Sequence, residues 1–211
     1  MKLAPPGGLF DETVIHNLFP NETEGARRLL AYRATQAGEI IRLKRGLFIL
    51  APEYRKSEAH PFVIAALLHG PSHVSLESAL AHHGLIPEAV YQVASVTAAR
   101  SRKFKTALGI FTFQRVPASD PRAGVETLKL PADAWAFIAT PLRAIADMVY
   151  LDKAVSWQRD GFAYLTDSLR IEKEDLRRIS FRPLEAICES LRDCRTVDYL
   201  KQLHKAMKHE C

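Results

Sequence analysis

The order of patterns in the first 55 residues constrains the fold of this chain most strongly. Apolar residues at helical spacing predict a short helix over residues 9–18, and a proline-containing turn at 19–21 ends it. A second helix is expected over residues 21–37, with Asn21 as its N-cap. Two β-rich runs, 39–43 and 47–50, flank a short turn and predict a hairpin. Helix, sharp turn, helix and hairpin form the back half of a winged helix-turn-helix.

Basic residues are concentrated in this helix–hairpin unit. The second helix of such a motif enters the major groove of DNA, and the hairpin, or wing, reaches the neighbouring backbone. An apolar stripe that includes Leu29 and Leu30 is expected to face the core. An ordinary surface helix and hairpin would also carry basic residues, so this alternative stays open. The predicted DNA contacts are Arg27, Arg28, Arg33, Arg42, Lys44 and Arg45.

From Pro61 onward the pattern changes to that of a second domain. Helices are expected over 62–68, over 76–83 with Ser75 as N-cap, and from Thr140-Pro141 to Leu151. We predict an α+β protein with two domains: a winged helix-turn-helix over residues 1–55, and a mixed α/β domain with a helical tail over residues 56–211. Trp135 and Phe137 are expected in a fully or nearly buried strand rather than in a stacking platform. The expected strands cover 91–97, 110–116, 125–130 and 135–139.

Three phrases of the sequence resemble AbiEi-type antitoxins of type IV toxin–antitoxin systems. The first is the wing, Gly38-Glu39-Ile40-Ile41-Arg42-Leu43-Lys44-Arg45-Gly46-Leu47-Phe48-Ile49-Leu50. The second is Ser75-Leu76-Glu77-Ser78-Ala79-Leu80 with the nearby Gly84-Leu85-Ile86-Pro87. The third is Thr140-Pro141-Leu142-Arg143-Ala144-Ile145-Ala146-Asp147, in which Leu142 replaces the family's usual acid. The resemblance extends from about Asp11 to Leu151.

The resemblance implies a bacterial transcriptional autoregulator. Its winged helix would bind inverted repeats in double-stranded DNA at its own promoter, with two copies forming a dimer on the DNA, and repress the operon. Its C-terminal domain would counteract a nucleotidyltransferase-like toxin, with or without direct contact. The wing residues Arg42, Lys44 and Arg45 carry over as DNA contacts. The alternative is an interaction protein whose C-terminal domain sequesters a protein or RNA partner, with the winged helix as scaffold.

The start of the sequence departs from a complete winged helix, which has a helix before the helix-turn-helix. Only eight residues, including two prolines and two glycines, precede Leu9. We therefore expect the first helix to be short or missing, or the C-terminal domain to cover the exposed face. The two domains should then depend on each other.

A second basic cluster lies in the predicted C-terminal domain. Arg100, Arg102, Lys103 and Lys105 surround Phe104, and no acid occurs between Arg100 and Arg115. One interpretation is a solvated hairpin end. The other is a second nucleic-acid surface that adds phosphate contacts.

Composition and motifs exclude several other classes. The 211 residues are 47% hydrophobic and 25% charged with a net charge of +5, which is typical of a globular protein able to bind a polyanion. No signal peptide, membrane span or nucleotide-binding or nucleophile motif is present, so we expect a cytoplasmic protein that is not an enzyme and needs no cofactor or metal.

Glu77 and Asp147 are expected to be buried partners of arginines. Histidines should serve hydrogen bonding at helix ends. The three cysteines, Cys188, Cys194 and Cys211, do not suggest a disulfide framework.

Overall fold

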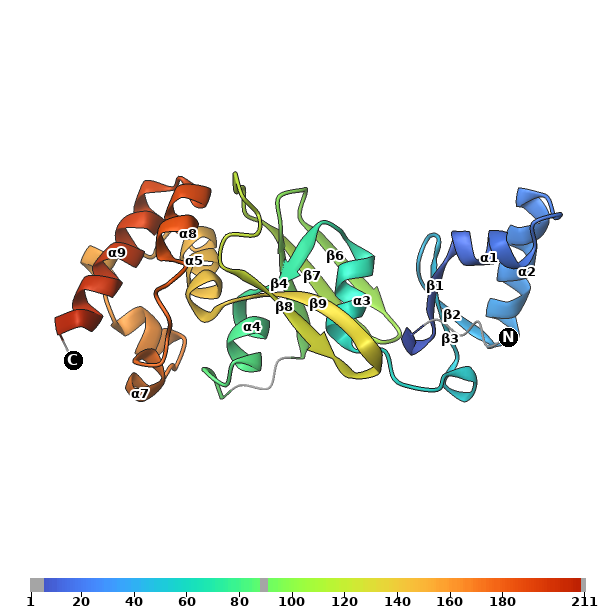
Figure 1. Ribbon diagram of the computed structural model, residues 1–211, viewed down its shortest axis with the longest axis horizontal. Helices are drawn as coiled ribbons and strands as arrows, with labels where there is room; N and C mark the ends of the chain where they lie inside the picture. Colours follow the sequence, from blue (N-terminus) through green and yellow to red (C-terminus); the bar gives the residue numbers. More distant parts are fainter. Residues whose placement is uncertain (1–5, 88–90, 210–211) are drawn as a thin grey trace.

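The protein is elongated, with its two ends at opposite tips (Figure 1). The computed structural model describes residues 6–87 and 91–209, so most of the proline- and glycine-rich lead and Cys211 lie outside the described residues. Along the long axis, a small N-terminal part is followed by a central sheet and then by a helical C-terminal part. The expected α+β class is confirmed.

The elements follow one another in three groups. The N-terminal part contains β1 (Leu9–Asp11), α1 (Glu12–Leu18), α2 (Glu24–Gln36), β2 (Ile40–Lys44) and β3 (Leu47–Leu50). The central part contains α3 (Pro61–Leu68), β4 (Ser72–Val74), α4 (Leu76–His82), β5 (Gln92–Thr97), β6 (Arg102–Thr106), β7 (Gly109–Arg115), β8 (Val125–Leu130) and β9 (Ala134–Ala139). The last group contains α5 (Pro141–Leu151), α6 (Trp157–Asp160), α7 (Lys173–Leu176), α8 (Leu184–Leu191) and α9 (Cys194–His209).

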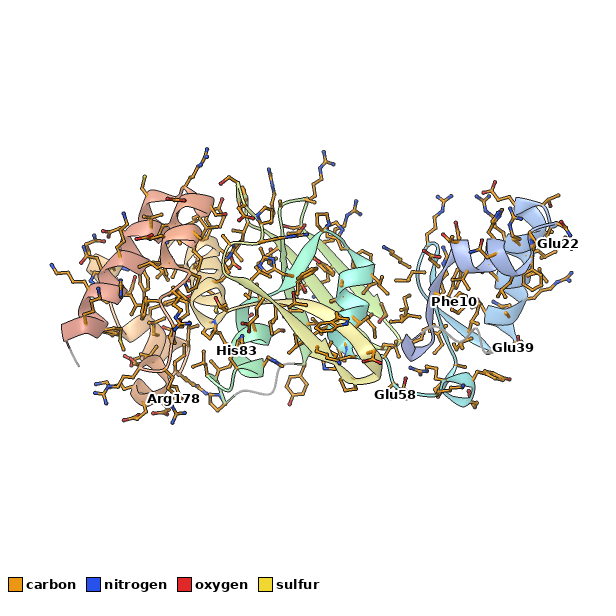
Figure 2. All side chains as sticks on the ribbon, viewed as in Figure 1. Phe10, Glu22, Glu39, Glu58, His83 and Arg178 are labelled. Carbon is orange, nitrogen blue, oxygen red and sulfur yellow. The ribbon has the colours of Figure 1, made fainter. Side chains whose placement is uncertain are left out.

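The N-terminal part is an antiparallel sheet in the order β1-β3-β2, with α1 and α2 on one face. The prediction of a helix from residue 9 is wrong because Asp11 caps α1, accepting hydrogen bonds from the backbone N–H groups of Thr13 and Val14. An N-cap residue has an extended backbone, so the residues before it can join a sheet. Phe10 stacks on Phe48 with ring centroids 5.6 Å apart, between the strands and the helices (Figure 2).

The α2 helix presents a different face to the core than the sequence predicts. Its N-cap is Thr23 rather than Asn21, and Thr23 Oγ1 accepts a hydrogen bond from the Ala26 backbone N–H. Ala31 and Ala34 pack against the sheet, whereas Leu29 and Leu30 are 47% and 37% exposed. The expected leucine stripe is therefore wrong. Small alanines allow α2 to approach the strands closely.

The central sheet has six strands in the order β6-β7-β5-β4-β9-β8. The four predicted strands are confirmed within one or two residues, but β4 and β6 were missed because each is short and rich in polar residues. Trp135 and Phe137 do not lie in a buried strand as predicted. They are 55% and 45% exposed because only the alternate face of β9, with Ala136 and Ile138, is buried.

The helix α3 joins the N-terminal part to the central sheet. Ile64, Ala65 and Leu68 of α3 share one apolar cluster with the N-terminal strands and with Phe111 and Phe113 of β7. The face of the N-terminal sheet opposite α1 and α2 is therefore covered by the second part of the chain. The dependence of the two parts on each other and the boundary at residue 55 both stay predictions.

Histidines contribute hydrogen bonds at helix ends, as predicted. His60 Nδ1 accepts from the Phe62 backbone N–H at the start of α3, and His83 Nε2 lies 2.9 Å from the Ala139 carbonyl oxygen after α4. His69 Nε2, just beyond α3, lies 3.1 Å from the carbonyl oxygen of Arg100. Within residues 6–87 and 91–209, no helix is both long and apolar enough to cross a bilayer.

Candidate nucleic-acid interface

A hollow of about 370 Å³ lies between α2 and the turn of the β2–β3 hairpin. Four of the six predicted DNA contacts line it: Arg27, Arg28, Arg42 and Arg45. The acids Glu12 and Glu24 also line it, so the lining carries both signs of charge, with positive charge in excess. Residues from two elements, 14 to 18 positions apart in sequence, are thus brought together on one concave surface.

The two arginines of α2 differ in how they are held. Arg27 Nη1 donates to the backbone carbonyl oxygens of Phe19 and Glu22, and therefore braces the turn between α1 and α2. Arg28 is 60% exposed and forms an ion pair with Glu24 one helical turn earlier. Exposed ion pairs of this kind contribute little to stability, so Arg28 can exchange its partner for a phosphate.

The three basic residues of the wing also divide into structural and free groups. Lys44 Nζ donates to the carbonyl oxygens of Leu67 and Leu68 at 2.8 and 2.9 Å, at the C-terminal end of α3. A cation there satisfies carbonyls that the helix leaves unpaired. Arg42 Nε makes only a long hydrogen bond of 3.4 Å to the carbonyl oxygen of Lys44. Arg45 is exposed, and no hydrogen bond or ion pair joins it to the residues that the structure describes.

Arg33 does not join the others. It is exposed on α2 but does not line the hollow, because five positions separate it from Arg28, about 140° around the helix. Conversely, Tyr32, Thr35 and Gln36 line the hollow although the sequence analysis did not select them. Tyr32 lies four residues after Arg28, and Thr35 and Gln36 lie three and four residues after Tyr32, so helical spacing is the signal that could have identified them. Gln36 is exposed and has the amide that pairs with adenine in the major groove.

Three of the four residues of the second basic cluster lie on β6, at the edge of the central sheet, and Arg100 lies just before this strand. Strand alternation divides the cluster. Arg102 pairs in register with Phe113, whose face of the sheet packs on α3, whereas Lys103 pairs with Thr112 on the other face. All four basic residues are exposed. The interpretation as a simple hairpin end is incomplete, because Arg102, Lys103 and Lys105 belong to a strand.

Of the two carboxylates that were predicted to be buried, Asp147 is buried and Glu77 is exposed. Asp147 is fully buried and accepts hydrogen bonds from Arg143 Nε at 2.9 Å and from Ser75 Oγ at 2.7 Å. Burial alone would raise the pKa of Asp147, but Arg143, His73 and Ser75 together lower it. Glu77 is exposed on α4, so its predicted role as a buried partner is wrong. Ser75 also makes no N-cap hydrogen bond to α4, because its hydroxyl is directed to Asp147.

No model of a protein family matches the chain, and a search of curated proteins also gave no match.

Proposed function

We propose that this protein is a DNA-binding transcriptional autoregulator, with the N-terminal part acting as a winged helix-turn-helix. The observation that carries the proposal is the hollow in which Arg28 of α2 faces Arg42 and Arg45 of the wing. A second helix and a wing that converge in this way match the two elements by which such motifs contact a groove and the adjacent backbone. The strand order β1-β3-β2 supports the same interpretation.

The residues of the hollow divide naturally between affinity and specificity. Arg42 and Arg45 have the charge to contact phosphates, which position the protein on the duplex. Arg28 and Gln36 have side chains that pair with guanine and adenine in the major groove. We assign Arg27 and Lys44 to holding the domain in shape, because their donors are used by backbone carbonyls.

The regulatory role rests on the resemblance of the sequence to AbiEi-type antitoxins. Under this proposal the protein binds inverted repeats at its own promoter as two copies. Its C-terminal part counteracts a nucleotidyltransferase-like toxin. Neither activity requires a cofactor or a catalytic residue of this chain.

The decisive experiment measures binding of the full-length protein to a labelled duplex from its own upstream region over a range of salt. Each phosphate contact contributes about −0.9 to the slope of log K against log salt. The double variant Arg42→Gln/Arg45→Gln should reduce the slope by about two contacts. Arg178→Gln, at the opposite end of the molecule, is the matched control (Figure 2). Absent or salt-insensitive binding by the wild-type protein would contradict the proposal.

The antitoxin role has a separate test. Co-expression with a nucleotidyltransferase-like product of the neighbouring gene should restore growth that the product alone arrests. Failure to restore growth, with both proteins present and folded, would remove the antitoxin role while leaving DNA binding intact.

A further inference from the structure

Two large aromatic side chains lie exposed on the central sheet, and neither lines the arginine-lined hollow. Trp135 and Phe137 are two residues apart on β9, so their rings project from the same face of the strand. More than half of Trp135 and nearly half of Phe137 is exposed. Buried aromatics are the ordinary use of such residues, so two exposed rings on the same face of one strand require another explanation.

A basic side chain lies over each ring. Lys129 pairs with Trp135 in the β8–β9 register, and its Nζ lies 5.7 Å from the Trp135 ring centroid. The Arg122 guanidinium carbon lies 5.9 Å from the Phe137 ring centroid. Exposed cation–π pairs are weak and their cations are flexible, so a third planar group can enter beside the ring. Alternating rings and cations suit a ligand that has planar groups on an anionic backbone.

The same face of the sheet carries further positive charge. Following the register from β6 through β7 and β5 to β4 places Lys103 and Lys105 on the face that carries His73. The parallel pairing of Val74 with Ile138 then places Phe137 on this face too. The two lysines therefore lie on the same side of the sheet as the two aromatic residues but at the opposite edge, and the buried residues Ala94 and Val96 lie between them.

Phe137 also forms a wall of a hollow of about 270 Å³. Polar groups in its lining include Ser72, Asp120 and Arg122. Thr127 is exposed and pairs with Phe137 across the strands. Hydroxyl and carboxylate groups beside an aromatic ring can bond to a base edge and to a ribose 2′-hydroxyl, the group that distinguishes RNA from DNA.

We propose that Trp135 and Phe137 form a stacking surface for single-stranded RNA, with Lys129 and Arg122 contacting its phosphates. Successive bases stack on the two rings, and Asp120 and Thr127 bond to a 2′-hydroxyl. This surface is separate from the duplex-binding hollow and would give the C-terminal part an activity of its own.

Intrinsic fluorescence tests the proposal directly, because the chain has only two tryptophans. Trp157 packs against Phe162 and Tyr199, with ring centroids 5.3 and 5.4 Å away. In Trp157→Phe, the remaining emission comes from Trp135, and an octamer of uridine should quench it to saturation. In Trp135→Phe, the emission comes from Trp157 and should not change. Absence of saturable quenching in Trp157→Phe would overturn the proposal.

Variants at Phe137 separate stacking from simple apolar contact. In the Trp157→Phe background, Phe137→Leu should weaken RNA binding about tenfold or more, because loss of one stacked base has effects of this size. Phe137→Tyr keeps the ring and should retain binding. Equal affinities for the leucine and tyrosine variants, both with wild-type circular dichroism, would overturn the stacking assignment.

Two further comparisons identify the ligand and the surface. The deoxyuridine octamer should bind more weakly than the RNA octamer, and equal binding would overturn the assignment of RNA as the ligand. Arg45→Gln in the same background should leave the quenching unchanged. Loss of quenching in Arg45→Gln would instead assign RNA to the N-terminal hollow and overturn the proposed surface, whatever the outcome of the duplex experiment.

Discussion

The buried arginine of the central part and the exposed arginines of the N-terminal hollow use the same side chain in opposite ways. Arg143 is fully buried, and its Nε and Nη1 donate to Asp147 and to the Ala123 carbonyl oxygen. Arg45 is exposed and has no such partner within the described residues. A buried charge requires a partner inside the fold, whereas an exposed one keeps its donors for a ligand. The position of the charge therefore indicates its function better than the net charge does.

The largest expected effect comes from breaking the buried pair. Asp147→Ala should lower the free energy of unfolding by about 3–5 kcal/mol, because it leaves the Arg143 guanidinium buried without its carboxylate. Urea denaturation followed by circular dichroism measures the loss. The double variant Arg143→Met/Asp147→Leu should be more stable than Asp147→Ala, since it removes both charges. A loss below about 1 kcal/mol in Asp147→Ala would contradict the internal role of the pair.

The same carboxylate gives a pH prediction. The pKa of Asp147 is lower in the folded protein than in the unfolded chain, so the unfolded chain binds more protons as the pH falls. Its contribution to stability is complete above the unfolded pKa and is lost as the pH falls through the folded pKa. Unfolding by urea at a series of acidic pH values should therefore be less pH-dependent in Asp147→Asn than in wild type. Parallel pH profiles would show that this group is not responsible.

Close packing around Arg143 gives the next largest effect. Gly124 has a φ of +69°, and an added Cβ would lie 2.6 Å from Ile187 Cδ1 and 2.9 Å from Arg143 Cβ. Gly124→Ala should cost about 2–4 kcal/mol, from the left-handed backbone and from overpacking together. Gly38→Ala is the matched control: its φ is +74°, but nothing lies within 4 Å of the added Cβ. Equal losses in the two variants would show that packing on Ile187 and Arg143 contributes nothing.

Lys44 and Arg45 are neighbours in the wing turn, and they differ in the same way: Lys44 is bonded within the fold and Arg45 is exposed. Lys44→Met should destabilise the protein by about 1–2 kcal/mol, because the Leu67 and Leu68 carbonyl oxygens lose a charged donor. Arg45→Met should change stability by less than about 0.5 kcal/mol and instead weaken duplex binding. Thermal unfolding and anisotropy on both variants measure the two effects. The reverse pattern would show that Lys44, rather than Arg45, is the DNA contact.

Sequence patterns predicted the helices and strands where a local signal was strong. Thr140-Pro141 begins α5 as expected, with Thr140 Oγ1 accepting from the Arg143 backbone N–H. The hairpin and Gly38 after α2 were also found, because turns and helix ends have local chemistry. β1 and β4 were missed, because three residues carry too little periodicity to distinguish a strand.

The burial of single side chains depended on tertiary contacts that no local pattern contains. The alternation around Trp135 is the same whether one face of β9 is covered or both, so exposure could not be deduced from it. The role of Lys44 could not be deduced from local sequence either. Its sequence neighbours suggest a DNA contact, but its partners are Leu67 and Leu68 of α3, 23 and 24 residues later. Four of the predicted arginines line the hollow and Arg33 does not, whereas including Tyr32, Thr35 and Gln36 required the position of the wing.

The smallest expected effect concerns the basic strand β6, where strand alternation places basic residues on both faces of the sheet. Lys44 donates to the last carbonyl oxygens of α3. His69, the residue that follows α3, contacts the Arg100 carbonyl oxygen. The wing and the start of β6 therefore meet at the same end of α3. Arg102 lies on the α3 side of β6, whereas Lys103 and Lys105 lie on the other side.

A duplex that rests on the wing should reach the α3 side of β6 and not its opposite face. Arg100→Gln/Arg102→Gln should therefore reduce the salt slope of duplex binding by about one to two contacts, each about 0.9. Lys103→Gln/Lys105→Gln removes the same amount of charge from the opposite face of β6 and should leave the slope unchanged. Both double variants keep an exposed polar edge strand, so stability should not differ between them. Equal slopes in the two variants would mean that net charge, rather than the face of the strand, determines how β6 meets DNA.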